Sequence, residues 1–302
     1  MTAPAGCGKR SAPLVREVPV KSVLSKTNLP VCDYAVNPYV GCTHGCRYCY
    51  ASFMKRFTGH AEPWGAFLDV KRWPEIKRTE RYTGKGLFVG SVTDPYVPQE
   101  AVYRRTRTLL EQLRGSGARI TLQTKSDLVL RDADLIRTFP GARVGFSVNT
   151  LDEAFKDGMD SAPSIGRRLA AMRELHDAGI RTTCFISPIF PGITDVEAIV
   201  ERVRPHCNLI WLENLNLRGS YKADILGYIA QNRPELTLLY EGIYLHGDRR
   251  YWEGLDVRLR RWAQGQGLDY VRNDDILERP FGAPPTIVNY FYHEEVRKSD
   301  SR

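Results

Sequence analysis

Three cysteines, Cys42, Cys46 and Cys49, fall within eight residues of this 302-residue chain. The chain has seven cysteines in all, an odd number, and the other four are scattered. A disulfide framework would instead distribute pairs of cysteines along a short secreted chain. The crowding of three thiols therefore predicts a metal site.

The C-x3-C-x2-C spacing suits an iron–sulfur cluster. A cubane cluster normally takes four cysteine thiolates, so three local ligands leave one iron open to a chelating ligand, as a catalytic zinc keeps one free position. A zinc site completed by His44, His60 or a distant cysteine is the alternative. Structural zinc usually shows a second pair of ligands at close spacing, whereas Cys184 and Cys207 lie far off and apart.

The elements that must position this motif alternate between strands and helices. Strands are predicted at Tyr34–Val40, Gly86–Val92, Arg119–Thr124, Ala142–Asn149, Arg181–Pro188, Leu209–Asn214 and Leu236–Tyr240. Helices are predicted at Pro98–Arg114, Asp132–Phe139, Ser164–Ala178, Asp195–Arg204, Tyr221–Gln231 and Arg249–Gln264. Their apolar residues recur at helical spacing, and the alternation implies parallel strands joined by βαβ crossovers.

This series predicts an α/β fold, an incomplete (β/α)6-type TIM barrel in one domain spanning 31–272. Residues 1–30, rich in Ala, Pro, Lys and Ser, are expected to form a flexible N-terminal arm. Residues 273–302 are expected to form a C-terminal tail, a lid or a plug. In such a barrel the active site lies at the carboxyl ends of the strands, and the cysteine motif follows the first of them.

Composition excludes several classes of protein. With 42% hydrophobic and 26% charged residues, the chain is neither dominantly disordered nor of low complexity. No apolar run approaches the length that spans a bilayer, and Met1 to Val20 lacks the apolar core of a secretory signal, so a cytoplasmic protein without a membrane partner is predicted. The formal charge of +8 favours an anionic partner. Nine Lys or Arg and four acidic residues lie between His44 and Lys85. This basic stretch would contact the partner, or it is a solvated basic face.

The motif carries a family resemblance. Cys42-x3-Cys46-x-Tyr48-Cys49, with an aromatic residue before the third cysteine and a (βα) series behind it, resembles the radical SAM superfamily. The longer string from Gly41 to Ala51 is similar to the spore photoproduct lyase-like branch. Residues 50–74 further resemble the group called radical SAM mobile pair protein B. The resemblance spans about residues 21 to 285.

The resemblance implies two cofactors. Cys42, Cys46 and Cys49 would bind a [4Fe-4S] cluster, and S-adenosylmethionine would chelate the fourth iron through its amino and carboxylate groups. Reduction would cleave the sulfonium to methionine and a 5′-deoxyadenosyl radical, which abstracts hydrogen from substrate. The cofactor carries this chemistry, and the protein orients it and excludes water.

The resemblance also implies contacts to S-adenosylmethionine. The family's GGE-type contact is missing after the second predicted strand, where Gly90-Ser91-Val92-Thr93-Asp94 stands instead. Arg167 could pair with the carboxylate, or be a surface residue. The implied cofactor-binding residues are Tyr48, Ser91, Thr93, Asp94, Thr124, Lys125, Ser126, Ser147, Asn149 and Arg167.

Substrate contacts are expected at the same ends of the strands. Glu213, Asn214 and Asn216 follow the sixth predicted strand, and Glu241 and Tyr244 follow the seventh. Such positions are either substrate contacts or rim residues. Trp211 is expected to lie in the core or a groove rather than to stack on a base.

Three functions remain open. The first is a radical SAM enzyme acting on nucleic acid or a nucleotide. The second is radical SAM modification of a peptide or small metabolite, alongside a second radical SAM protein. The third is a non-catalytic iron–sulfur or zinc protein. Either enzyme would require an external electron donor of the flavodoxin or ferredoxin type.

Overall fold

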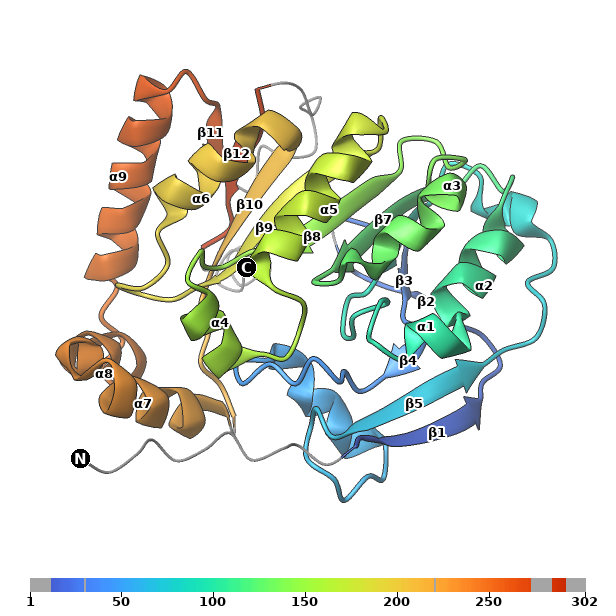
Figure 1. Cartoon of the computed structure of the whole chain (residues 1–302), viewed down its shortest axis with the longest axis horizontal. Helices are drawn as coiled ribbons and strands as arrows, with labels where there is room; N and C mark the ends of the chain where they lie inside the picture. Colours follow the sequence, from blue (N-terminus) through green and yellow to red (C-terminus); the bar gives the residue numbers. More distant parts are fainter. Residues whose placement is uncertain (1–11, 30, 220, 273–283, 292–302) are drawn as a thin grey trace, which may run out of the picture.

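The chain is an α/β protein built on a mostly parallel sheet (Figure 1). The computed structural model describes residues 12–29, 31–219, 221–272 and 284–291. Its strands are β1 (Leu14–Pro19), β2 (Leu24–Lys26), β3 (Tyr34–Val36), β4 (Tyr39–Val40), β5 (Phe67–Arg72), β6 (Gly86–Val89), β7 (Arg119–Thr124), β8 (Arg143–Ser147), β9 (Arg181–Ile189), β10 (Leu209–Asn214), β11 (Tyr270–Arg272) and β12 (Thr286–Asn289).

Helices connect these strands. The α-helices are α1 (Glu100–Tyr103), α2 (Arg105–Leu113), α3 (Ala133–Ile136), α4 (Glu153–Met159), α5 (Ile165–Asp177), α6 (Val196–Val203), α7 (Tyr221–Asn232), α8 (Thr237–Leu245) and α9 (Arg250–Gly265). The 3-10 segments are η1 (Tyr50–Phe57), η2 (Thr79–Tyr82), η3 (Asp127–Asp132), η4 (Arg204–His206) and η5 (Pro234–Leu236). None of the described helices is both long and apolar enough to cross a bilayer.

The large sheet has the strand order β11-β12-β10-β9-β8-β7-β6-β3-β2. Strands β3, β6, β7, β8, β9 and β10 are neighbours in chain order and pair in parallel. This confirms the predicted α/β fold with a (β/α)6 series. Strands β12 and β11 extend it in parallel, so residues 286–289 of the expected tail belong to the sheet. The expectations for 273–283 and 292–302 lie outside the described residues.

The two faces of the large sheet differ. One face, here called the outer face, is covered by helices such as α2, α5 and α6 (Figure 1). Alternate residues of β9 and β10, among them Ile186 and Leu212, point to this face and join Met172 of α5 and Ile199 of α6 in the main hydrophobic core. The opposite face, the inner face, carries Phe185 and the other residues of alternate parity.

A second, three-stranded sheet has the order β1-β5-β4 (Figure 1). The predicted strand Tyr34–Val40 is therefore divided between two sheets, because Pro38 has no N–H to donate to a continuous ladder. Residues 14–19 and 24–26, expected in a flexible arm, are strands that pair with β5 and β3. Residues 24–26 are too few to show an alternation, and the adjacent charges Arg16 and Glu17 interrupt any alternation in residues 14–19. Pairing with β5 and β3 stabilises both strands.

One predicted strand is wrong. Leu236–Tyr240 is the end of η5 and the first turn of α8. A short apolar run does not distinguish a strand from a buried helix, and here the apolar residues continue to Leu245, where they pack against α7. The predicted helix Asp132–Phe139 is reduced to α3, which directly follows η3.

Candidate functional site

The cysteine motif forms a tight loop after β4. Gly41 has φ +84°, and a Cβ there would lie 2.5 Å from the carbonyl oxygen of Phe67, so the entry to the loop requires glycine. The Gly45 amide donates to the Cys42 carbonyl at 3.1 Å, and the Cys49 amide donates to the Cys46 carbonyl at 3.2 Å. These two turns place all three side chains within one short loop.

The Cys42 side chain is buried, Cys46 and Cys49 are half-buried, and the three thiols interact electrostatically. Burial raises the pKa of Cys46 to about 12 and that of Cys42 well above its usual value, and the neighbouring thiols raise the pKa of Cys42 further. Burial also raises the pKa of Cys49, although the Trp64 indole opposes the shift. Thiolates are the form that binds metal, and grouped buried thiolates need positive charge close by. The loop thus fits a group with several metal ions.

A cluster and a single metal ion make different demands on the three cysteines. Within the described residues, no group of three His, Cys, Asp or Glu side chains is placed to hold one metal ion. In a cubane each cysteine binds a different iron, so the sulfurs surround the group rather than converge on one point. His44 and His60, the alternative zinc ligands, have carboxylate neighbours: His44 Nε2 lies 3.2 Å from Asp94 and His60 Nε2 lies 2.8 Å from Asp69.

Trp64 lies against the cysteine loop. Its indole Nε1–H donates to Cys49 Sγ at 3.2 Å, and its ring packs edge-on to Phe67, with centroids 5.7 Å apart. A Cβ on Gly65 would lie 2.9 Å from the Gly45 Cα, so the chain after Trp64 crosses the loop at backbone contact. Trp64 was not among the predicted site residues, although it lies within residues 50–74, which carry part of the family resemblance.

Asp94 joins the cysteine loop to the end of β7. Its carboxylate accepts from the Thr124 hydroxyl and the Lys125 amide, each at 2.7 Å, and His44 lies against it. Burial alone would raise the pKa of Asp94, but His44, Thr124 and the Lys125 amide hold it at about 2. Thr93, the residue before it, donates to the Gly41 carbonyl. Asp94 and Thr93 therefore hold the cysteine loop next to the end of β7.

A polar centre lies beside Cys46 and Tyr48. The Tyr48 hydroxyl donates to Asp160 at 3.1 Å, and Arg168 donates to the same carboxylate at 3.0 Å. Burial would raise the pKa of Asp160, but Arg168, Lys125 and Lys156 hold it low. Lys125 Nζ lies 5.7 Å from the centroid of the Tyr48 ring. Three cations thus surround one carboxylate, which leaves local positive charge for an anionic group.

Ser147 and Asn149 end β8 next to this centre. The Ser147 carbonyl accepts from the buried Arg168 at 3.1 Å, and its hydroxyl accepts from Gln123 at 3.1 Å. Asn149 is 3% exposed, and its side-chain NH2 has no hydrogen-bond partner within the described part of the chain. A buried, unpaired donor costs free energy unless a ligand satisfies it. Asn149 therefore fits a contact to a bound cofactor.

Other predicted cofactor contacts lie elsewhere. Arg167 is 63% exposed and pairs with Asp127 at 2.8 Å, which matches the surface alternative. Its neighbour Arg168 is the one that points inward, and helical periodicity alone could not choose between adjacent arginines. The Ser126 hydroxyl accepts from the Leu128 amide and starts η3. Ser91 accepts from Asn37 at 2.9 Å.

The predicted substrate residues are divided. Glu213 lies on the inner face at the end of β10, where Ser187 donates to it at 2.9 Å. Asn214 ends the same strand, and the Asn216 side chain accepts from Arg218 at 3.0 Å. Glu241 and Tyr244 do not follow a strand, because they lie on α8; the Tyr244 hydroxyl donates to the Leu215 carbonyl at 3.0 Å.

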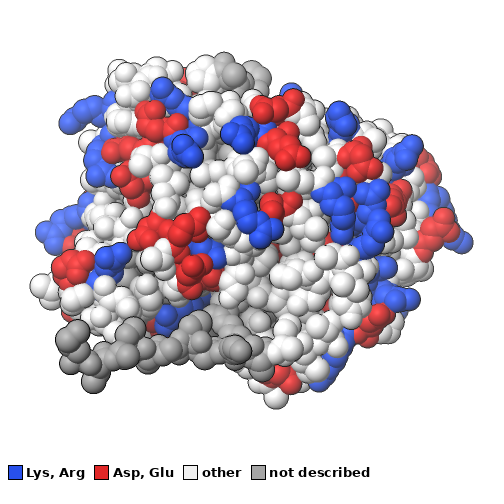
Figure 2. Space-filling model, viewed as in Figure 1, with Lys and Arg blue, Asp and Glu red and all other residues white. Residues whose placement is uncertain are grey.

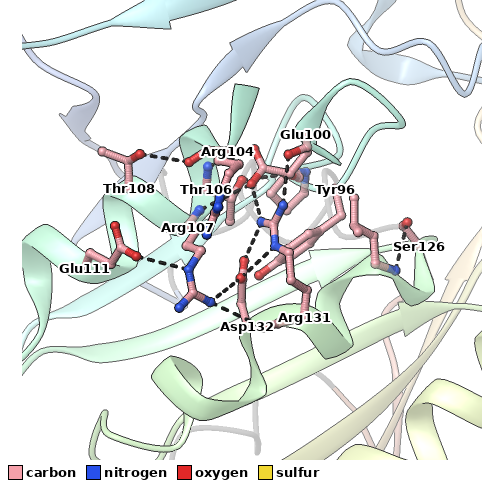
Figure 3. A network of polar contacts seen from close by, with 12 residues as sticks. Tyr96, Glu100, Arg104, Thr106, Arg107, Thr108, Glu111, Ser126, Arg131 and Asp132 are labelled. Carbon is pink, nitrogen blue, oxygen red and sulfur yellow. Dashed lines mark hydrogen bonds and ion pairs between the residues drawn. The ribbon is translucent and has the colours of Figure 1, made fainter. Parts of the chain in front are cut away.

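A buried ion network joins α1, α2 and η3 (Figure 3). Glu100 is fully buried and accepts from Arg131 at 2.5 Å and from the Thr106 amide at 3.0 Å. Arg131 also pairs with the buried Asp132 at 2.7 Å. The Tyr39 hydroxyl, three residues before Cys42, donates to Glu100. The start of the loop is therefore fixed to α1, α2 and η3.

Comparisons with known proteins agree with this geometry. The model of the radical SAM superfamily matches residues 36–203. An uncharacterized protein of Methanocaldococcus jannaschii is 35% identical over 221 residues, which cover 72% of this chain and 83% of the relative. The chain therefore belongs to the radical SAM superfamily. It is a radical SAM enzyme whose cofactors are a [4Fe-4S] cluster and S-adenosylmethionine.

Two further matches have described activities. Spore photoproduct lyase, solved with bound AdoMet and dinucleoside spore photoproduct, has the same fold, with a TM-score of 0.54 and 17% identity over 74% of this chain and 66% of the lyase. The radical SAM Nalpha-GlyT isomerase of Pseudomonas phage M6 is 27% identical over 173 residues, which cover 55% of this chain and 36% of the isomerase. The chain thus spans about two thirds of the lyase and about a third of the isomerase.

Proposed function

We propose that Cys42, Cys46 and Cys49 each bind one iron of the [4Fe-4S] cluster and that S-adenosylmethionine binds the fourth. The supporting observation is the group of three mutually interacting thiols, one buried and two half-buried, beside the carboxyl ends of parallel strands. When bound and reduced, this pair of cofactors supplies a 5′-deoxyadenosyl radical that abstracts hydrogen from substrate. The protein holds the thiolates, orients the sulfonium and excludes water.

The polar centre supplies the contacts to S-adenosylmethionine. Lys125 provides positive charge for its carboxylate, and the unpaired amide of Asn149 donates to its polar groups. Ser147 borders the same space, while the Tyr48 backbone faces the adenine. Thr93, Asp94 and Thr124 act indirectly, since they hold the cysteine loop against β7. Arg168 and Asp160 position Tyr48.

The substrate is proposed to be a nucleic acid or a nucleotide. The spore photoproduct lyase fold, seen with a dinucleoside ligand, supports this class, as does the charge of +8. Two cations of the basic stretch from His44 to Lys85 have carboxylate partners, since Arg72 pairs with Glu17 and Lys85 with Asp33. Figure 2 likewise shows basic and acidic residues interspersed over one face. Contact with phosphate is therefore expected near the strand ends, and the alternative substrate is a peptide or metabolite.

Partners follow from the chemistry. Reduction of the cluster requires an external electron donor of the flavodoxin or ferredoxin type. The likeness of residues 50–74 to radical SAM mobile pair protein B suggests a second radical SAM protein acting alongside this one. A neighbouring radical SAM gene would support that pairing, and its absence from the genome would count against it.

The test is anaerobic reconstitution followed by dithionite reduction with S-adenosylmethionine, measuring 5′-deoxyadenosine. Wild type should form it and Cys46→Ala should not. Cys32→Ala is the matched control, because Cys32 lies outside the loop and is half-buried; it should retain wild-type formation. Four irons bound without S-adenosylmethionine binding or cleavage would overturn the proposal.

A further inference from the structure

The inner face of the large sheet carries a row of aromatic rings on neighbouring strands. Phe185 of β9 and Trp211 of β10 are direct register partners, with ring centroids 6.5 Å apart. Trp211 lies next to Tyr290, which follows β12, with centroids 5.0 Å apart. The three rings come from three adjacent strands, so the sheet itself holds them in line.

Two of these rings are not closed in as ordinary core residues are. Their chain neighbours on the outer face, Ile186 and Leu212, are 0% exposed beneath the helices. Phe185 and Trp211 remain half-buried, and Trp211 borders a small cluster that includes Val288, whereas Tyr290 is buried. Part of the Phe185 and Trp211 rings is therefore open to a ligand on the inner face.

Glu213 lies beside this row with unused acceptor capacity. Its two carboxylate oxygens accept from Ser187 Oγ at 2.9 Å and from Trp211 Nε1 at 3.3 Å, whereas a carboxylate has about four acceptor sites. No Lys, Arg or His within the described ranges forms a salt bridge with it. Burial raises its pKa, although Ser187 and Trp211 oppose the shift.

We propose that Trp211, flanked by Phe185 and Tyr290, stacks on a planar heterocycle whose edge N–H donates to Glu213. The ligand class is a nucleobase, and the inference rests on the proposed radical SAM function of the same site. Enzymes that act on a base outside the helical stack read it through its hydrogen-bonding edge and stack it between aromatic side chains. A flexible aliphatic metabolite would use neither the flat rings nor a fixed acceptor.

The geometry makes two demands on the ligand. Stacking requires a flat ring, so a sugar phosphate without a base should not bind here. The ligand edge must also carry a hydrogen-bond donor, because the ionised Glu213 carboxylate has acceptors and no donor. A base whose edge nitrogens are methylated keeps its stacking surface and loses its donors, which separates the two contributions.

The experiment is a 19F NMR titration of the oxidised holoenzyme, with S-adenosylmethionine present and tryptophan replaced by 5-fluorotryptophan. Five tryptophans give five signals, and Trp211→Phe identifies the Trp211 signal by its loss. The probes are the four common deoxynucleoside 5′-monophosphates, with deoxyribose 5-phosphate as the control without a ring. At least one nucleotide should shift the Trp211 signal, and the sugar phosphate should not.

Glu213→Gln tests the acceptor. It should weaken binding of that nucleotide about tenfold or more, in line with loss of a hydrogen bond to a charged group. Glu235→Gln, at an exposed position on η5, is the matched control and should bind as wild type does. If Glu213→Gln fails to fold, the N-methylated counterpart of the bound nucleotide provides the same comparison in wild-type protein, where it should also bind about tenfold more weakly.

The 5′-deoxyadenosine assay on the same samples separates this inference from the proposed function. No 5′-deoxyadenosine from wild type would refute the proposed function, whatever the nucleotides do. Normal 5′-deoxyadenosine formation with no nucleotide shifting the Trp211 signal would refute the nucleobase site alone. Equal binding by wild type and Glu213→Gln, or equal binding of the methylated nucleotide, would refute the role of Glu213.

Discussion

The two faces of β9 and β10 show how one pair of strands serves both stability and function. On the outer face, Cys184, Ile186 and Leu212 are fully buried against helices. On the inner face, residues of the opposite parity, Ser187 and Glu213, form polar contacts and remain half-buried. Side chains alternate between the two faces along a strand. Adjacent residues of β9 and β10 therefore belong to different environments, the buried outer face and the half-buried inner face.

Because of this difference, we expect substitutions on the two faces to have different effects on stability and binding. An outer-face residue loses packing on every side when it is shortened, because protein interiors are close-packed. An inner-face residue has fewer protein neighbours, so its replacement should change binding more than folding. The predictions below test this division, beginning with the largest effect on stability.

Leu212→Ala should reduce the free energy of unfolding by about 2–5 kcal/mol, since it removes a fully buried side chain and leaves a cavity. Ser187→Ala, on the inner face of the neighbouring strand, should cost about 1 kcal/mol or less, the net worth of one hydrogen bond. Urea unfolding of the reduced apoprotein measures both. Similar costs for the two variants would refute the division between the faces.

Glu100→Gln should destabilise the protein by about 3 kcal/mol, because it leaves Arg131 with one fewer anionic partner in a buried network. The Tyr39 hydroxyl would also lose its charged acceptor, so iron content after reconstitution should fall. Glu111→Gln is the matched control, since that carboxylate is about half exposed and its pair with Arg107 is peripheral. Unchanged stability and iron content in Glu100→Gln would show that the network does not support the cysteine loop.

Asp256→Asn should cost about 1–2 kcal/mol at neutral pH. The Asp256 carboxylate accepts from Tyr270 at 2.8 Å and Arg272 at 3.1 Å, and so joins α9 to β11. Burial would raise the pKa of Asp256, but the hydrogen bonds from Tyr270, Asn289 and Arg272 lower it. Because the pKa of Asp256 is lower in the folded than in the unfolded state, its ionised carboxylate stabilises the fold above the unfolded pKa of about 4. This stabilisation is lost as the pH falls through the pKa of the folded state.

The difference in stability between wild type and Asp256→Asn should therefore narrow below about pH 4. Unfolding curves of the apoprotein at several pH values measure this change. A difference that stays constant down to pH 3 would mean that the carboxylate charge contributes nothing and that the hydrogen-bond geometry alone matters.

Trp64→Phe should have the smallest effect on stability, because the phenyl ring can keep the contact with Phe67. It removes the N–H donor to Cys49 Sγ, and hydrogen bonds to cluster sulfurs set the reduction potential. Without this donor the midpoint potential of the cluster should fall, as measured by a redox titration monitored by EPR. Trp262→Phe, on α9, is the control, and equal potentials in the two variants would rule out tuning by Trp64.

Several elements were predictable because their signals are local. The strands at 119–124, 181–189 and 209–214 and the helix over 165–177 follow from apolar runs and helical spacing. The Leu236–Tyr240 strand failed because a short, largely apolar run suits either element, and packing against α7 decides for a helix. The strands β2 and β12 are short, and adjacent charges interrupt the pattern of β1. All three depend on pairing with distant partners, which no local pattern reveals.

The site was predictable to a similar degree. The cysteine spacing is a covalent property of the chain. It predicted a metal site, and the resemblance that it carries implied the cofactors and the family without any structure. Asp160, Arg168 and Trp64 were missed because their importance depends on what they face. Arg167 and Arg168 are adjacent and chemically identical, yet one pairs with Asp127 at the surface and the other is 0% exposed beside Asp160.

The sequence by itself determined the class of chemistry and the alternation of strands and helices, because both depend on the types and spacing of neighbouring residues. Only the tertiary structure decided which side chains meet. Glu213 and Ser187 come from different strands, 26 positions apart, and Tyr290 reaches Trp211 only because β12 inserts between β10 and β11. Such contacts follow from strand order, and strand order is set by packing of the whole chain.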